Sequence, residues 1–148
     1  MSGLPSSRKL LISKILFIYT TYLRINVVVT SVLSEQSNQS GGIHLHLLLK
    51  LAMHNKSTYH LVQEANQCIW KLERNEAAQA YLNSIDILII EELELINSEL
   101  YSTVELVLQH TMNNDLKAGN KLIISNGDPH QLLNINGSSF WLSNHFIF

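Results

Sequence analysis

Cysteine, proline and glycine are all scarce in this chain of 148 residues. The single cysteine, Cys68, excludes an internal disulfide, and we expect it to be a small buried apolar side chain. One cysteine and seven histidines also fall short of a zinc ribbon. We find no internal repeat and no low-complexity run, and the length suits one domain.

Charge is also sparse, since only 15% of the residues are charged and the formal net charge is −2. A chain with this balance has no overall basic field, so a nucleic-acid partner would need a local basic patch, which composition does not reveal. By contrast, 46% of the residues are hydrophobic, which is enough for a globular core and excludes wholesale disorder.

A long uninterrupted apolar run is missing as well. The Leu-, Ile- and Val-rich stretch 10–33 follows Arg8 and Lys9, as the apolar core of a signal peptide would. However, Lys14 and Arg24 interrupt it, and no apolar span of about 18 residues remains. We therefore expect no membrane segment, and carbonate extraction of the expressed chain would test the alternative of a membrane-inserted protein.

What the chain does have is a short apolar strand that ends in acids, residues 85–92 with the sequence IDILIIEE. This pattern indicates a buried parallel strand, and ligands of open α/β sheets bind at the carboxyl ends of such strands. In nucleotide hydrolases the first acid, here Glu91, helps to hold Mg²⁺, and the second, Glu92, orients or deprotonates the attacking water. An acidic helix start would look the same, because Glu91, Glu92 and Glu94 would favour the positive end of a helix.

Hydrophobic periodicity predicts strands that alternate with helices, which favours a parallel α/β sheet. The predicted elements in chain order are helix 10–23, strand 26–32, helix 43–53, helix 61–72, helix 76–82, strand 85–90, helix 98–110 and strand 121–125. We expect Ser98 to cap the last helix, and residues 35–42 to form a loop or a frayed helix.

The last predicted strand is followed by residues 127–132, with the sequence GDPHQL. An acid-ended strand, a helix, a strand and then Gly-Asp-x-x-Gln-Leu is the order of motifs II and III in superfamily-one helicases. The sequence resembles the Pif-type DNA helicases, including the copies carried by mobile elements, over nearly its whole length.

Other residues carry the same resemblance. Thr30, Gly41, Gly42 and His46 match the family pattern, and residues 140–145 (FWLSNH) match a motif that some members carry after motif III. His46 is then expected near the site or the DNA path. His44 and His46 also alternate like a metal-binding pair, but no further ligands lie nearby in the sequence.

The resemblance also places a phosphate-binding loop at the start of the chain. Gly3 and Lys9 have the required spacing, but Arg8 stands where the second glycine belongs and Leu10 where the hydroxyl belongs. A side chain at Arg8 obstructs the close approach of the backbone to phosphates, and leucine cannot ligate Mg²⁺. We therefore expect impaired nucleotide chemistry.

By this resemblance, residues 1–148 form part of the first RecA-like motor domain, a parallel sheet flanked by helices. Because only two residues precede Gly3, we expect the strand that enters the phosphate loop to be missing, together with the second motor domain. The resemblance implies a site for ATP and Mg²⁺ with Gly3, Lys9 and Asp128 on the nucleotide, Glu91 on the metal, and Glu92 and Gln131 in catalysis.

The activity that the resemblance implies is ATP-driven unwinding of DNA in the 5′-to-3′ direction. Single-stranded or forked DNA is then the expected partner, in the nucleus or the mitochondrion, with roles in DNA repair, recombination and telomere maintenance. Because Arg8 and Leu10 depart from the motif, we expect the chain alone to hydrolyse ATP poorly or not at all and not to unwind DNA. The alternative is a non-enzymatic helicase remnant that binds DNA or a protein partner.

Overall fold

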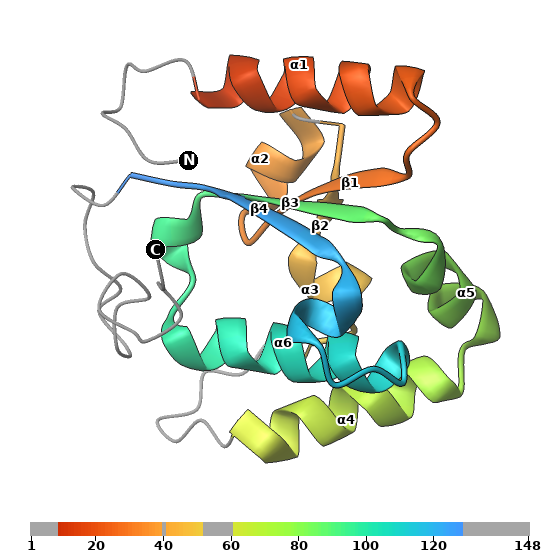
Figure 1. Ribbon diagram of the computed structural model, residues 1–148. Coiled ribbons are helices and arrows are strands. Elements are labelled where there is room, and N and C mark those ends of the chain that lie inside the picture. Colours follow the sequence, from red (N-terminus) through yellow and green to blue (C-terminus); the bar gives the residue numbers. More distant parts are fainter. Residues whose placement is uncertain (1–8, 40, 52–60, 129–148) are drawn as a thin grey trace.

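The computed structural model describes residues 9–39, 41–51 and 61–128, which form a parallel sheet with helices on both faces (Figure 1). The strand order is β2-β1-β3-β4, and each neighbouring pair is parallel. The predicted parallel α/β sheet flanked by helices is therefore confirmed.

β3 (Ile87–Glu91) lies inside the sheet between β1 (Val27–Ser31) and β4 (Leu122–Asn126). All five β3 residues are buried, as expected for an apolar, Ile-rich strand that is covered on both faces. The pairing register sets Ser31, Glu91 and Asn126 side by side, because each is the last residue of its strand.

One face of the sheet is covered by α3 (Leu45–Leu48), α4 (Leu61–Glu73), α5 (Glu76–Ser84) and α6 (Ser98–Thr111), which lie below the sheet in Figure 1. These helices and the sheet share one large core. Its fully buried members include Leu45, Cys68, Leu72, Leu82, Leu88, Ile90, Val104, Val107 and Leu108. Cys68 is thus the buried apolar side chain that its sequence context predicts.

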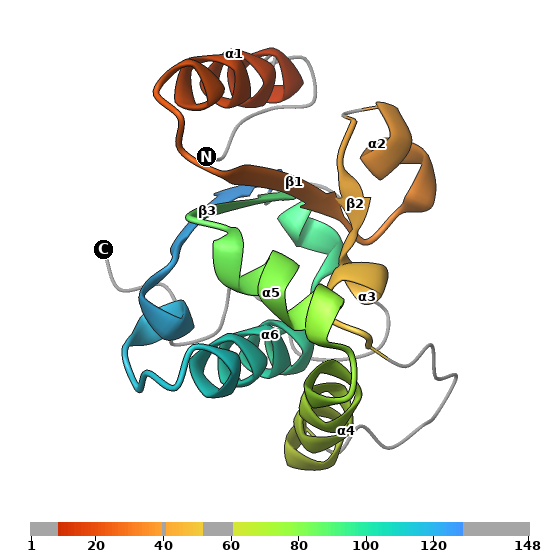
Figure 2. The same ribbon diagram turned by 90° about the vertical axis from the view of Figure 1, so that its right-hand side faces the viewer.

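The opposite face is covered by α1 (Lys9–Tyr22), and the short helix α2 (Ser34–Gln39) lies on the same side, against β1 and β2 (Figures 1 and 2). The core here is small: Val29, Ile87 and Ile89 are buried, and Leu16 of α1 packs against them. Within the described ranges, no helix has the length and apolarity that crossing a membrane requires.

Most predicted elements lie within about two residues of the observed ones, but the helix predicted over 43–53 is wrong in part. Ile43 and His44 form strand β2 against the end of β1, and α3 ends at Leu48. Lys50 then has a positive φ of 57°, which breaks the helical backbone.

One helix cap differs from the prediction, whereas residues 35–42 agree with their helical alternative. The residue that caps α6 is Asn97 and not Ser98, because the Asn97 side chain accepts a hydrogen bond of 2.8 Å from the Leu100 backbone N–H. The loop or frayed helix over 35–42 contains a short helix, α2 (Ser34–Gln39).

Candidate functional site

The candidate site lies where β3 and β4 end. Glu91 and Asn126 are neighbours in the sheet, and their side chains are 6% and 3% exposed. The Asn126 Nδ2 amide donates a hydrogen bond of 2.6 Å to Glu91 Oε2 and a longer one of 3.4 Å to Ser13 Oγ. A buried polar link therefore joins α1 to the ends of both strands.

Several buried oxygen atoms at this end of the sheet have no hydrogen-bond partner among the described residues: Glu91 Oε1, Glu92 Oε2 and Asn126 Oδ1. A buried acceptor without a partner costs about 1–3 kcal/mol, so such groups in a folded protein call for an explanation. Carboxylate and amide oxygens are also the ligands that hard cations prefer. The strand ends can therefore accept hydrogen bonds or bind a cation.

Glu92 occupies a strained position immediately after β3. Its backbone is left-handed, with φ 56° and ψ 52°, a conformation that is uncommon for residues other than glycine. Burial raises the pKa of Glu92, and the neighbouring Glu94 and Glu91 carboxylates raise it further, whereas a hydrogen bond to Ser31 opposes the shift. A raised pKa is what a carboxylate needs to act as a general base near neutral pH.

The competing interpretation of these acids as a helix start finds little support in the geometry. Glu92 precedes a short 3-10 helix, η1 (Leu93–Leu95), but its side chain makes no capping hydrogen bond. The next α-helix, α6, begins only at Ser98 and is capped by Asn97. The acids thus lie at a strand end, as the nucleotide-hydrolase interpretation requires.

The turn after β4 packs against the same acids. The Asp128 backbone N–H donates a hydrogen bond of 3.1 Å to Glu94 Oε2, and both side chains are buried. A Cβ at Gly127 would come within 2.6 Å of that Glu94 oxygen and 3.0 Å of Leu93 Cβ. Glycine at this position therefore lets the turn approach η1 closely and brings Asp128 to the site.

The structure leaves other predicted site residues untested. Lys9 is the first residue of α1, whose beginning lies at the strand-end side of the sheet (Figure 1). Gly3, Arg8 and Gln131 lie outside the described residues, as does the FWLSNH segment. Phosphate binding by Gly3 and Lys9, and nucleotide sensing by Gln131, therefore stay predictions.

The residues present fit a nucleotide-bound magnesium ion better than a protein-only metal site. Among the described residues, no group of three or more His, Cys, Asp or Glu side chains is placed to hold a metal. Mg²⁺ needs only one or two carboxylates, because substrate phosphates and waters supply its other ligands. Glu91, with one unpaired buried oxygen, meets that requirement.

His44 and His46 lie one strand further along the same end of the sheet. His44 pairs with Ser31 in the β1–β2 register, and the two histidine rings are 5.1 Å apart. Burial lowers the pKa of His46, the neighbouring His44 lowers it further, and Glu64 opposes the shift. At neutral pH, His46 therefore favours its uncharged form.

Sequence reasoning missed Ser13 and Asn126. Asn126 carried a usable signal, because it is a polar residue at the end of a predicted strand, as Glu91 is. Ser13 carried a weaker one, a small polar residue in a helix that is rich in apolar residues.

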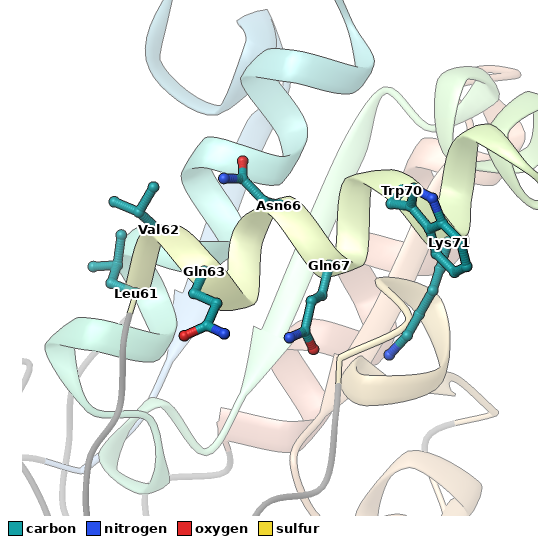
Figure 3. Close-up of a pocket in the computed structure, with 7 residues that line it drawn as sticks. All are labelled: Leu61, Val62, Gln63, Asn66, Gln67, Trp70 and Lys71. Carbon is teal, nitrogen blue, oxygen red and sulfur yellow. The ribbon is translucent and has the colours of Figure 1, made fainter.

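A groove with a volume of about 960 Å³ lies along α4 (Figure 3). Its lining consists of Leu61, Val62, Gln63, Asn66, Gln67, Trp70 and Lys71. All seven belong to one helix, whereas ligand sites are usually concave and lined by groups that converge from several elements. We therefore place the candidate site at the strand ends and not in this groove.

Comparison with solved structures places this fold among those of Pif1 helicases. Pif1 from Candida albicans matches 90% of this chain with a TM-score of 0.74 and 19% identity. Bacteroides sp Pif1 in complex with ADP-AlF4 matches 82% with a TM-score of 0.65 and 19% identity. Bacteroides Pif1 in complex with ADP-AlF3 and ssDNA matches 74% with a TM-score of 0.56 and 19% identity.

The chain spans 29%, 27% and 24% of those three proteins. No protein-family model matches the sequence, and no curated protein matches it. The likeness therefore concerns the fold, which is the RecA-like α/β fold found in Pif1 helicases. The predicted resemblance to Pif-type helicases is confirmed at this level.

Proposed function

We propose that this chain is a nucleotide-binding, helicase-like module that binds ATP with Mg²⁺ at the ends of β3 and β4. The observation that carries the proposal is the buried Glu91 carboxylate beside Asn126, followed at once by Glu92 with a raised pKa. The Pif1 structures with ADP-AlF4 and with ssDNA support nucleotide and DNA as the ligand classes.

The chemistry of such a site follows from the roles of its side chains. Mg²⁺ bound with ATP would neutralise the charge that develops on the phosphates. Glu91 would offer its unpaired Oε1 on the metal side, while Asn126 holds its other oxygen. Glu92 would accept a proton from the attacking water, and Asp128 and Lys9 would lie on the nucleotide side.

We propose that this module derives from an ATP-driven DNA helicase that unwinds in the 5′-to-3′ direction, the activity that the resemblance to Pif-type helicases implies. For this chain alone we propose ATP binding with little or no hydrolysis and no unwinding. The support is Arg8 and Leu10 in the phosphate loop, since leucine cannot supply the hydroxyl ligand. Nuclear or mitochondrial location and roles in DNA maintenance stay predictions.

Thermal unfolding of the whole chain with a non-hydrolysable ATP analogue tests nucleotide binding. A ligand at 100 times its Kd stabilises the folded state by about 2.7 kcal/mol. We expect a rise in Tm that requires Mg²⁺. The control variant Glu76→Gln, which removes an exposed acid on α5, should show the same rise. The absence of any shift would refute the proposal.

ATPase assays with single-stranded DNA test the second part of the proposal. We expect turnover at or near background for the wild-type chain and for Glu92→Gln. Hydrolysis that single-stranded DNA stimulates and that Glu92→Gln abolishes would show an active motor fragment instead.

The second candidate function is a non-enzymatic remnant that binds DNA or a protein without nucleotide. Leu10 in place of the metal-binding hydroxyl is the observation that favours it. Binding of a fluorescent single-stranded oligonucleotide, together with no response to ATP analogues, would identify this case.

A further inference from the structure

The polar link between α1 and the strand ends is unusual in its composition. Ser13, Glu91 and Asn126 are 2%, 6% and 3% exposed, and they come from three different elements. The side chains of Ser13 and Glu91 converge on Asn126 Nδ2, which lies 2.6 Å from Glu91 Oε2 and 3.4 Å from Ser13 Oγ. Burying a carboxylate and an amide so completely is costly unless every polar atom is matched.

Two buried oxygens of this polar link lack hydrogen-bond partners among the described residues. These two oxygens are Glu91 Oε1 and Asn126 Oδ1. A structural hydrogen-bond network would be expected to satisfy these acceptors, since nearly all buried polar groups in folded proteins have partners. An unmatched carboxylate oxygen and an unmatched amide oxygen on neighbouring buried side chains are instead groups that a hard cation would satisfy.

Ser13 lies three residues after Leu10, which occupies the place of the hydroxyl in the phosphate loop. Residues three apart share one face of a helix, so Ser13 lies one turn along from the lost hydroxyl. Ser13 Oγ accepts a hydrogen bond from Asn126 Nδ2, and its second lone pair can bind a cation. Glu91 has one methylene more than an aspartate would have, which extends its reach by about 1.5 Å.

We propose that Ser13, Asn126 and Glu91 form a displaced divalent-cation site, in which Ser13 Oγ and Asn126 Oδ1 replace the hydroxyl ligand that Leu10 cannot supply. This inference rests on the proposed function in assigning the cation to the nucleotide. The three side chains then provide two neutral oxygens and one carboxylate, a donor set that suits Mg²⁺ or Mn²⁺.

The hydrogen bonds of Asn126 show how its side chain could serve this site in two ways. The Asn126 amide directs its positive Nδ2–H₂ group at the Glu91 and Ser13 oxygens, so it takes the place of the cation. Rotation of the amide by half a turn presents Oδ1 instead, which is unfavourable beside a carboxylate until a cation joins them. Asn126 thereby changes from hydrogen-bond donor to metal ligand.

Replacement of Asn126 by aspartate distinguishes a cation site from a hydrogen-bond link that has only a structural role. Asn126→Asp removes the donor and sets a second carboxylate beside Glu91, so without a cation the two charges repel each other. We expect this variant to have a lower Tm than the wild type in EDTA and a larger rise in Tm with Mg²⁺. If it is unfolded in EDTA, Mg²⁺ should refold it.

Ser13→Ala provides the opposite change, because it deletes a ligand and adds no charge. We expect about tenfold weaker binding of Mn²⁺, measured by electron paramagnetic resonance without nucleotide, since loss of one metal-site group typically costs 10- to 100-fold. Thr20→Val is the matched control: Thr20 is also buried on α1, but its hydroxyl donates within the helix to Leu16.

The inference is wrong if Mn²⁺ binds the wild type, Ser13→Ala and Asn126→Asp equally, or if Mg²⁺ fails to stabilise Asn126→Asp more than the wild type. Nucleotide binding is measured separately with a fluorescent ATP analogue. Nucleotide binding that both substitutions leave unchanged would refute the displaced site and retain the proposed function. Cation binding with the expected variant pattern but no nucleotide binding would refute the proposed function alone.

Discussion

The two faces of the sheet are covered very differently. On one face α3, α4, α5 and α6 share a single large core with the strands, whereas the core on the other face is small and Leu16 of α1 packs against it (Figures 1 and 2). Even this helix is poorly covered, because Ile15, Ile18 and Tyr22 are 57%, 68% and 80% exposed.

The difference shows which interactions hold each layer. The four-helix face is held by apolar packing, while α1 depends on a few apolar contacts near Leu16 and on the buried link from Ser13 to Asn126. The candidate site lies between the two layers, since Ser13 comes from α1 and Glu91 from the sheet. Occupation of the site would therefore strengthen the weaker layer.

The largest expected effect contrasts adjacent residues of β3. Ile89 and Ile90 are both fully buried but belong to the cores of opposite faces. We expect Ile90→Ala to cost about 4 kcal/mol, within the 2–5 kcal/mol usual for such truncations. Ile89→Ala should cost about 2 kcal/mol, because a lightly held α1 can settle into the cavity. Urea denaturation measures both, and an equal or larger loss at Ile89 would contradict the comparison.

This asymmetry could not have been read from the sequence, although much of the fold could. The apolar run before Glu91 predicts β3 and its acids, because strand length and burial are local signals. Periodicity likewise predicts α1 but cannot say what covers its outer side. That depends on segments distant in the chain, as the large exposure of Tyr22 illustrates.

The candidate site also has a part that the sequence predicts and a part that it does not. Glu91 and Glu92 follow from a local motif, whereas the link from Ser13 to Asn126 joins residues 113 positions apart and depends on strand register and helix placement. The helix predicted over 43–53 fails for a related reason. β2 has two residues, too few for an alternating pattern, and only its pairing with β1 defines it.

The next effect concerns the link itself. Asn126→Ala removes the donor to Glu91 and Ser13, and we expect a loss of about 1–3 kcal/mol, the usual result of leaving buried polar groups unsatisfied. Amide hydrogen exchange should accelerate in α1 more than in α6, because only α1 is held through this residue. Equal acceleration in both helices would show that the two layers unfold together.

A smaller effect is expected from Glu92, which lies where the layers meet. Its pKa is raised in the folded state above the ordinary value of 4.5, so the folded protein retains a proton that the unfolded chain releases. Stability from this group is therefore present below the ordinary value and lost as pH rises through the folded pKa. We expect Glu92→Gln to raise Tm at pH 7 relative to wild type but not at pH values below the ordinary pKa. A Tm difference that does not change with pH would contradict this expectation.

The smallest effect is expected on the outer side of α1. Ile18 is 68% exposed, so Ile18→Gln should change the free energy of unfolding by no more than about 0.5 kcal/mol, as surface substitutions usually do. Leu72→Gln is the control, because Leu72 is 1% exposed in the core of the other face and should cost several times more. Light scattering should also show less association for Ile18→Gln, since exposed apolar patches promote it. If Ile18→Gln instead costs more than about 1 kcal/mol, the outer side of α1 is covered in solution and the two faces differ less than their packing indicates.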